Sequence, residues 1–326
     1  MPLIYDDLFG RHDKVEEAIH RLQAFEPPDV PYWLAFSGGK DSQAVYHLAK
    51  LAGVKFEAHY TVTTVDPPQQ VQFIKQAYPD VKREMAHYAK DVIVDGQRMR
   101  EAGEPVTMWK LIVDNMMPPT RKARYCCRTL KESNGRGRVM ITGVRWEESP
   151  TRKKVHGLVD IRGAQKRAWQ RIETYGAEAR STGRDSAVLN NDNDEARQVV
   201  EHCFRTIRTT LNPIVDWAEE DVWEFLNDVV KVPHCELYDQ GWKRLGCIGC
   251  PMANAEERRR AFETWPKYKD AYTRAFQRMV ELREARGMKD SLTKCIEREE
   301  SNSAVPLRDE TDGERCMRIF LDGRYL

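Results

Sequence analysis

The chain has 326 residues, enough for one large α/β domain with additions or for two modest domains. Its 52 Lys and Arg residues nearly balance its 51 Asp and Glu residues, so any nucleic-acid surface would have to be local. No apolar run approaches the length of a membrane span, and residues 1–7 lack the pattern of a signal peptide. We therefore expect a cytoplasmic protein without a membrane partner.

The N-terminal part of the chain predicts a helix followed by a strand and a glycine-rich turn. Within residues 1–26, apolar side chains recur at helical spacing, which indicates an amphipathic lead-in helix. The apolar run 32–36 then predicts a strand, and residues 43–51 predict a helix. Between them lies the polar turn Ser37-Gly-Gly-Lys-Asp-Ser42.

This strand–turn–helix arrangement predicts a phosphate site. Gly38 and Gly39 allow backbone N–H groups to approach a ligand closely, and the helix N-terminus adds partial positive charge. Lys40 supplies a cation, while Ser37 and Ser42 supply hydroxyl donors. The spacing does not fit a Walker A loop. The alternative is a Gly-Gly turn that only begins a helix, but the full hexapeptide in this context favours a nucleotide site.

Alternating strands and helices continue after the turn. A second strand is expected over 54–62, and it ends at a turn that contains Thr63 and Asp66. In open α/β sheets the ligand crevice lies at such carboxyl ends. Further elements are expected in this order: a helix at 69–78, a weak strand at 81–85, a short helix at 109–117 and a buried strand at 138–145. The alternation predicts a doubly wound, mostly parallel sheet with helical C-terminal additions.

The second half of the chain is less regular in pattern. Residues 160–210 are polar and rich in turn residues, so we expect an insertion with a mobile loop. Helices are expected at 216–226 and, with a break at Trp265-Pro266, at 256–286; the tail after Ser301 is expected to be irregular. These features divide the chain into an N-terminal helix (1–26), a nucleotide-binding domain (27–235) and a cysteine-motif and helical region (236–326).

Eight cysteines suggest a metal site. Cys247 and Cys250 have the C-x-x-C spacing of metal ligands on a tight turn, which also fits a redox pair. Cys126, Cys127 and Cys235 are further candidates, whereas a pair of buried small apolar side chains is the alternative. In a cytosolic chain, metal ligands or catalytic thiols are expected over disulfides. The isolated Cys203, Cys295 and Cys316 are interpreted as structural or incidental thiols.

Five segments carry a family resemblance. The hexapeptide 37–42 resembles the PP-loop of N-type ATP pyrophosphatases, which split ATP between the α- and β-phosphates. Four further segments resemble motifs of the phosphoadenosine-phosphosulfate-reductase superfamily, in the same order: RYCCRTLK at 124–131, GVRWEESPTR at 143–152, NPIVDW at 212–217 and RLGCIGC at 244–250. The last segment is most similar to the ATP-pyrophosphatase subunit of DNA phosphorothioation systems.

The resemblance implies an enzyme that binds ATP and Mg²⁺ and adenylylates a DNA backbone phosphate before sulfur replaces an oxygen. It implies catalytic roles for Lys40, Asp41, Arg145 and Arg152. The implied nucleotide-binding residues are Ser37, Gly38, Gly39, Lys40, Asp41, Ser42, Thr63, Asp66, Gly143 and Arg145. The implied ligands of a [4Fe–4S] cluster, with zinc as the second choice, are Cys126, Cys235, Cys247 and Cys250, with Cys127 as a substitute.

The implied partners are DNA, a cysteine desulfurase that donates sulfur, and other phosphorothioation subunits; a homodimer is left open. Three alternatives also remain open: an adenylylsulfate or phosphoadenylylsulfate reductase, a non-catalytic ATP-sensing iron–sulfur module that binds nucleic acid, and an enzyme acting on tRNA. The basic stretch Arg162, Lys166, Arg167 and Arg171, with Trp169 inside it, predicts either a track for a DNA backbone or a solvated helix face.

Overall fold

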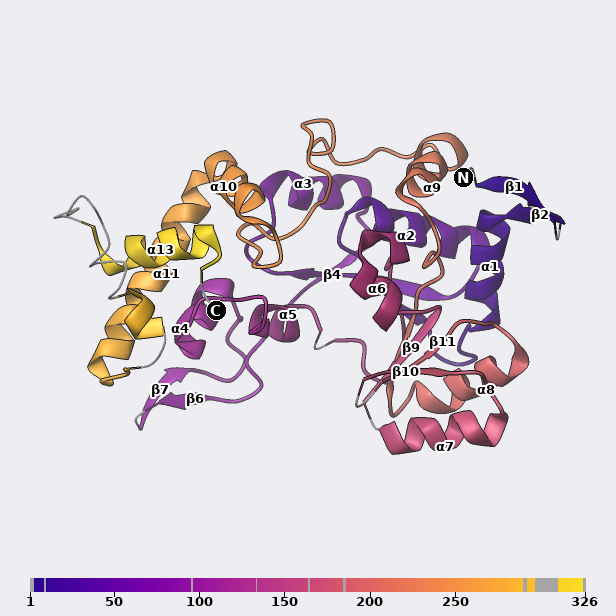
Figure 1. Ribbon diagram of the computed structural model, residues 1–326, viewed down its shortest axis with the longest axis horizontal. Helices are drawn as coiled ribbons and strands as arrows, with labels where there is room; N and C mark the ends of the chain where they lie inside the picture. The colour runs from indigo at the N-terminus through magenta and orange to yellow at the C-terminus, as the bar shows by residue number, and fades with distance from the viewer. Residues whose placement is uncertain are drawn as a thin grey trace. The chain divides into compact units, whose positions relative to one another are not determined.

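The computed structural model describes residues 3–8, 10–94, 96–132, 134–163, 165–183, 186–289, 292–296 and 310–324 (Figure 1). The chain divides into two compact units, each built from separated segments. Unit 1 comprises residues 1–60, 69–83 and 134–245; unit 2 comprises 61–68, 84–133 and 246–326. Among the described residues, no helix is long and apolar enough to cross a membrane.

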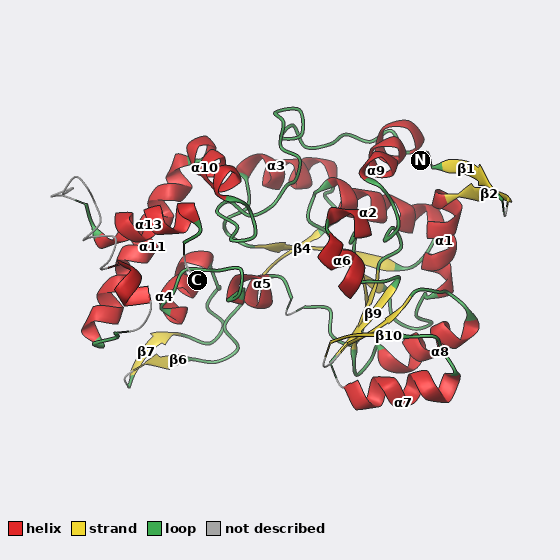
Figure 2. Ribbon diagram, in the orientation of Figure 1, coloured by secondary structure: helices red, strands yellow, loops and turns green. Residues whose placement is uncertain are grey.

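An eight-stranded sheet in the order β10-β11-β9-β12-β8-β3-β4-β5 organises unit 1 (Figure 2). The central pairs β12–β8, β8–β3 and β3–β4 are parallel, and Leu34 lies opposite both Ala58 and Ile141. The pairs β10–β11, β11–β9 and β9–β12 are antiparallel. The strands have these bounds: β3 Tyr32–Ala35, β4 Phe56–Val62, β5 Lys82–Met85, β8 Val139–Ile141, β9 Val159–Arg162, β10 Arg180–Gly183, β11 Ser186–Leu189 and β12 Arg208–Leu211.

Helices cover this sheet and form its core. In α2, Lys40–Ala52, nine of the thirteen residues are buried, and the helix contacts α1, α9 and η2. Its Leu48 is inaccessible to solvent, as are Leu22 of α1 and Leu34 of β3. The remaining elements of unit 1 are α1 Lys14–Ala24, α3 Pro68–Ala77, η1 Trp146–Glu148, α6 Pro150–Val155, α7 Gln165–Tyr175, α8 Asp194–Cys203, α9 Glu219–Glu224 and the π-helical turn η2 Phe225–Val229. The predicted α/β class, with a mostly parallel central sheet, is confirmed.

Two expectations for unit 1 need correction. The stretch 160–210, expected to be turn-rich and mobile, contains two helices and supplies part of four neighbouring strands, β9 to β12. Its strands are only four residues long, so their alternation is too short to stand out from the polar sequence around them. In addition, the lead-in helix begins only at Lys14, after a hairpin of β1 (Ile4–Asp7) and β2 (Gly10–Asp13).

Unit 2 is mainly helical around an aromatic core. Tyr272, Phe276 and Phe320 are buried, and their rings contact one another within 5.8 Å. The long charged helix breaks at Trp265, as predicted, into α10 Ala255–Thr264 and α11 Pro266–Ala285. The tail is not wholly irregular, because α13 (Asp312–Asp322) packs on α11. The other elements are β6 Val92–Val94, β7 Gln97–Arg100, α4 Met108–Asn115 and α5 Tyr125–Leu130.

Candidate active site

The predicted phosphate loop joins β3 to α2 and has a fixed backbone. Gly38 has φ of +74°, and a Cβ at this position would lie 2.6 Å from Ile74 Cγ1, so both the conformation and the space require glycine. The Gln70 side-chain amide donates to the Ser37 carbonyl at 2.5 Å. Gln43 likewise donates to the Gly38 carbonyl at 3.1 Å. Side chains thus hold two carbonyls of the loop and fix its backbone at the start of α2, a helix end whose partial positive charge favours an anion.

Hydroxyl groups complete the inside of the loop. Ser42 Oγ donates to the Gly39 carbonyl at 2.8 Å and lies 3.2 Å from Ser37 Oγ. Gly39 is the N-cap residue of α2 and supplies no side-chain cap, so an anion is the ligand best suited to that helix end. The predicted residues Ser37, Gly38, Gly39 and Ser42 are therefore brought together by one turn.

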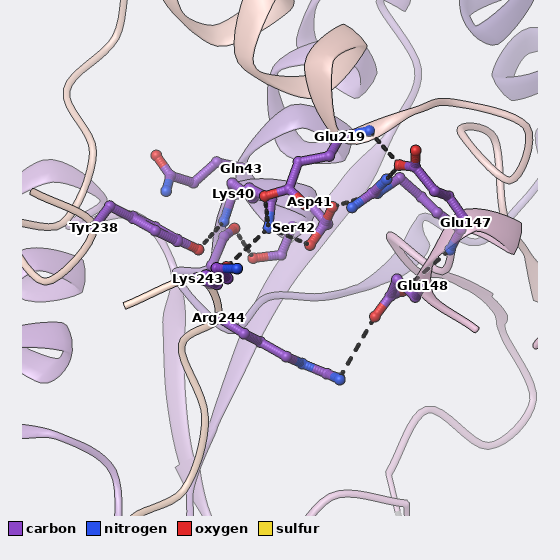
Figure 3. Close-up of polar contacts among 12 residues, drawn as sticks. Lys40, Asp41, Ser42, Gln43, Glu147, Glu148, Glu219, Tyr238, Lys243 and Arg244 are labelled. Atoms are coloured by element: carbon purple, nitrogen blue, oxygen red, sulfur yellow. Dashed lines mark hydrogen bonds and ion pairs between the residues drawn. The ribbon is translucent and has the colours of Figure 1, made fainter. Parts of the chain in front are cut away.

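Lys40 is nearly enclosed, with an exposed fraction of 4% (Figure 3). Its Nζ donates to the Lys243 carbonyl at 3.3 Å and forms an ion pair with Glu219 Oε1 at 3.4 Å. Its backbone N–H donates to the hydroxyl of Tyr238 at 2.9 Å. Protein oxygens thus occupy both the ammonium group and the first amide of α2, which are the donors expected to bind phosphate.

Tyr238 is the main site residue that sequence reasoning missed. Its ring packs edge-on against Trp223, with 5.0 Å between the centroids. Burial raises the pKa of its hydroxyl above the ordinary value, so the group stays protonated and can donate as well as accept. No motif in the sequence marks this tyrosine, because it reaches the loop from almost two hundred residues away.

Buried Arg145 forms an ion pair with the half-buried Asp41 beside the loop. Arg145 Nε lies 2.6 Å from Asp41 Oδ1, and Nη1 lies 3.0 Å from Glu147 Oε2. Burial opposes the charge of Arg145, but Asp41 and Glu147 outweigh it and raise the pKa of the guanidinium. This approach requires Gly143, where a Cβ would lie 2.7 Å from the Asp41 carbonyl. The pair therefore fixes Asp41, which was predicted to help place Mg²⁺.

Glu148 links two further arginines at the pocket. Its carboxylate lies 3.6 Å from Arg244 Nη2 (Figure 3). It also lies 3.2 Å from Arg152 Nη1 and accepts the Arg145 N–H at 3.3 Å. Glu148 and Arg244 were present in the motifs quoted above but were given no role. The pocket is lined by Ala35, Ser37, Gly39, Asp41, Ser42, Gly143, Val144, Glu148, Arg152, Tyr238, Arg244 and Leu245. It is therefore a polar pocket lined by residues of the loop 37–42 and by two arginines.

Thr63, Asp66 and four of the predicted thiols lie in unit 2. Cys247 Sγ lies 3.6 Å from Thr63 Oγ1 and 3.9 Å from Asp66 Oδ1. The C-x-x-C turn is held by the Ile248 N–H, which donates to the Val65 carbonyl at 2.7 Å. Gly249 at its centre has φ of +70°. The turn and the segment after β4 are thus one structure, although they are far apart in the sequence.

The thiols influence one another electrostatically. Hydrogen bonding from Cys126, followed by the nearby Arg124, lowers the pKa of Cys127, and the same contact with Cys127 raises the pKa of Cys126. Burial raises the pKa of Cys247 against the attraction of Lys131. Cys247 in turn raises the pKa of Lys131, which was present in the motif at 124–131 but was given no role. Cys126, Cys127, Cys247 and Lys131 thus form a set of mutually perturbed groups.

This set has donor chemistry that suits a thiolate-bound metal, and Lys131 offsets negative charge. Within the described residues, however, no three His, Cys, Asp or Glu side chains converge as they would around a metal ion. Cys235, the fourth predicted ligand, is buried in unit 1. Cys203 and Cys316 are buried in α8 and α13, and Cys295 is half-buried in a short helix at 292–296.

Comparisons with known proteins identify the family. The family model described as "Phosphoadenosine phosphosulfate reductase domain" matches residues 31–253, which include the phosphate loop, Arg145, Arg152 and the C-x-x-C turn. The chain belongs to this family. The match covers well over half of the chain and ends just beyond Cys250.

Individual relatives match over shorter stretches. An uncharacterised protein of Methanocaldococcus jannaschii is 46% identical over 57 residues, which are 17% of this chain and 13% of that protein. An uncharacterised 37.8 kDa protein of Escherichia phage 186 is 26% identical over 149 residues, or 46% and 36% of the two chains. Adenosine 5′-phosphosulfate reductase of Allochromatium vinosum is 40% identical over 43 residues, or 13% and 16%. The matches thus span about a third or less of these relatives' own lengths.

Proposed function

We propose that this chain is a cytoplasmic PP-loop ATP pyrophosphatase that adenylylates a phosphate of a DNA backbone and supports its replacement by sulfur. The observation that carries the proposal is the intact loop: Gly38, at positive φ, turns the chain into the N-terminus of α2, and the first residue of that helix is Lys40. Such donors favour the charge that develops on phosphate oxygens during displacement. An enzyme that cleaves ATP needs this loop to hold the β- and γ-phosphates.

The proposed reaction has two displacements. A non-bridging oxygen of the DNA phosphate attacks the α-phosphorus of ATP, forming a P–O bond as pyrophosphate leaves. A thiol reduces the persulfide sulfur delivered by the desulfurase to the oxidation level of sulfide and is itself oxidised to a disulfide. This sulfur then forms a P–S bond at the DNA phosphorus, and AMP leaves with the original oxygen. Lys40 and Mg²⁺ would offset phosphate charge, and Arg145 would keep Asp41 oriented for the metal.

Arg152 and Arg244 are proposed to contact anionic groups once Glu148 releases them. In the structure Glu148 lies within 3.6 Å of both guanidinium groups. A phosphate can bind an arginine through two parallel hydrogen bonds. Such an interaction is stronger than the 3.6 Å ion pair between Arg244 and Glu148. Substrate binding would therefore replace one protein–protein ion pair by a protein–substrate one.

We further propose that unit 2 holds a [4Fe–4S] cluster, with zinc as the second choice, on thiols drawn from Cys126, Cys127, Cys247 and Cys250. The family resemblance and the charge of Lys131 support this assignment. When bound, a cluster would supply a site for holding sulfur; the side chains would have to turn toward one another to bind it. A cysteine desulfurase and other phosphorothioation subunits are the proposed partners.

Reduction of adenylylsulfate to sulfite and AMP, with electrons from thiols, is the second candidate function. The observation that favours it is similarity to six sequences named as adenosine 5′-phosphosulfate reductases. Both candidates need a phosphate pocket and reactive sulfur, so the geometry alone does not separate them. The substrate does.

The deciding experiment measures pyrophosphate from ATP and sulfite from adenylylsulfate, using anaerobically purified protein with and without DNA. We expect DNA-stimulated pyrophosphate release that Lys40→Ala abolishes. Lys50→Ala is the matched control, because Lys50 lies on the same helix with half of its side chain exposed and pairs with Asp80. Thiol-dependent sulfite with ATP inert would overturn the proposal and establish the reductase. ATP bound but never cleaved would instead support a sensing module.

A further inference from the structure

A set of exposed cations begins beside the pocket and surrounds α6. Lys153 and Lys154 follow Arg152 in this helix, Arg162 ends β9 and Arg180 begins β10. Arg152 is half-buried, whereas the other four cations are exposed. We call Lys153, Lys154, Arg162 and Arg180 the basic strip. Because α6 and β10 contact each other within unit 1, the four cations come from neighbouring elements of the fold.

Polar contacts hold the strip together. Arg180 Nη1 donates to the Lys154 carbonyl at 2.5 Å, which joins β10 to the end of α6. Arg162 Nη2 lies 3.3 Å from Nδ1 of His156, the C-cap residue of α6. The indole N–H of half-buried Trp146 donates to the His156 carbonyl at 2.9 Å. The strip is therefore anchored on regular structure, with an aromatic ring at its edge.

The strip is short of neutralising carboxylates. Helix α6 contains no acidic residue, and Asp160, 3.7 Å from Arg162, is buried and bonded to His156. Within the described part of the chain, no ion pair involves Lys153, Lys154 or Arg180, whereas other surface lysines such as Lys82 and Lys110 pair at 2.6 Å or less. Three cations without counter-charges on a protein of net charge +1 concentrate positive potential there.

A structural role alone explains only part of this arrangement. Cations near the C-terminus of α6 complement its last carbonyls, and Arg180 does so directly. The ammonium groups of Lys153 and Lys154, however, contact no carboxylate in the described residues and are exposed. Keeping both next to Arg152, which lines the pocket, favours a ligand that carries several negative charges in a row.

We infer that the basic strip binds the sugar–phosphate backbone of the nucleic-acid strand whose phosphate enters the pocket. This inference rests on the proposed function, because a strand that presents one phosphate at Arg152 and Arg244 must continue over neighbouring surface. Successive phosphates would contact Lys153 and Lys154 and then Arg180 and Arg162. Such contacts position a strand without reading its sequence. Trp146 offers a face on which a base could stack.

The test compares Lys153→Ala/Lys154→Ala with Lys55→Ala/Arg136→Ala. The control pair is also exposed and without ion pairs among the described residues. It precedes β4 and β8, at the edge of the parallel strands opposite to the pocket. Binding of a fluorescent 20-nucleotide single strand is measured by anisotropy at several salt concentrations, and pyrophosphate release is measured with both the 20-mer and a dinucleotide.

We expect the strip variant to bind the 20-mer about tenfold more weakly, and its plot of log affinity against log salt to flatten by about 1.4, since each lost phosphate contact contributes about 0.7 for single strands. Turnover with the dinucleotide should be unchanged, because neither lysine lines the pocket. The control variant should match wild type. Equal binding by both variants, or a wild-type affinity independent of salt, would overturn the inference.

The two proposals fail separately. Salt-sensitive binding that depends on the strip, without any nucleic-acid-stimulated pyrophosphate release, would leave the strip as a binding surface and refute the proposed reaction. Stimulated release that is equal in wild type and the strip variant with the 20-mer would refute the strip and retain the reaction. Far-ultraviolet circular dichroism and melting temperature of both variants check that they remain folded.

Discussion

The two glycine-centred turns of this protein, one in each unit, share a geometry and differ in chemistry. Gly38 in the phosphate loop and Gly249 in the C-x-x-C turn have φ values of +74° and +70°. In both, a Cβ would lie 2.6 Å from a side chain of a packed helix, Ile74 in one case and Phe262 in the other. The first turn presents amides and a lysine, whereas the second presents thiols. Tight backbone packing is thus a common requirement, and the neighbouring side chains decide which ligand each turn suits.

The largest expected effect on stability is in the second turn. Gly249→Ala forces a left-handed conformation and drives Cβ into the rings of Phe262 and Tyr272, which cannot move aside easily. We expect it to lower the free energy of unfolding of unit 2 by about 4 kcal/mol. Gly287→Ala, also at positive φ but with nothing within 4 Å, should cost only about 1 kcal/mol. Hydrogen exchange of α11 amides measures both; equal costs would show that packing at Gly249 does not matter.

The first turn should respond somewhat less in stability but more in binding. Gly38→Ala meets the flexible side chain of Ile74, so we expect a loss of about 3 kcal/mol. Because the carbonyls and amides of the loop would also turn, ATP binding measured by calorimetry should be lost. Gly53→Ala, at φ of +70° in open space at the end of α2, is the control and should bind ATP normally. Retained binding in Gly38→Ala would contradict the account of the loop.

A smaller effect tests whether protein groups occupy the phosphate donors of the first turn. Tyr238→Phe removes the hydroxyl that accepts the Lys40 N–H and leaves the ring packing in place. We expect about 1 kcal/mol lower stability without ligand, and a larger rise in melting temperature on adding inorganic pyrophosphate than in wild type. Trp223→Phe, which alters the packing and keeps the hydroxyl, is the control. A smaller rise in Tyr238→Phe would mean that the hydroxyl helps to bind the anion.

The smallest expected effect concerns the stability of the two units as the pH falls. Lys82 and Arg138 lower the pKa of Glu57 in unit 1 to about 2, so its contribution is present above pH 4.5 and is lost as the pH falls toward 2. Burial raises the pKa of Asp114 in unit 2, so protonation of that group on acidification favours the folded state. Glu57 is partly exposed, and we expect about 1 kcal/mol from it.

Unit-resolved hydrogen exchange between pH 5 and 3 should therefore show unit 1 weakening first. Glu57→Gln should flatten the pH dependence of unit 1, and Asp114→Asn should change only that of unit 2. If both units lost protection in parallel, in the wild type and in Glu57→Gln alike, the stabilising role of charged Glu57 in unit 1 would be contradicted.

Local patterns explain which parts could be predicted from the sequence. The loop 37–42 is one continuous segment, so the strand–turn–helix geometry that places its glycines and serines together could be predicted from spacing. The grouping of Cys247 with Thr63 and Asp66 depends on backbone pairing between distant segments, which no spacing encodes. For the same reason, Tyr238 gave no sequence signal, and Lys131, although part of the motif at 124–131, was given no role.

In other parts of the chain the sequence does carry a signal for a helix or strand, but neighbouring residues typical of turns or loops hide it. Helix α13 begins with a capping box between Thr311 and Glu314 and has an apolar face, yet its charged flanks suggested an irregular tail. The short strands β10 and β11 contain serine, threonine and glycine, which are typical of turns, and they are stabilised by pairing with β9. Tertiary pairing overrode local preference there.

The order of strands in the sheet has a consequence for synthesis on the ribosome. Strands β3 and β4 emerge early, but β8, which lies against β3, begins only at Val139, and β12 only at Arg208. A nascent chain must therefore carry the open hydrogen-bonding edge of β3 while about eighty more residues are translated. Chains that terminate before β8 would expose this edge together with the unfilled phosphate loop, and should depend on chaperones to stay out of aggregates.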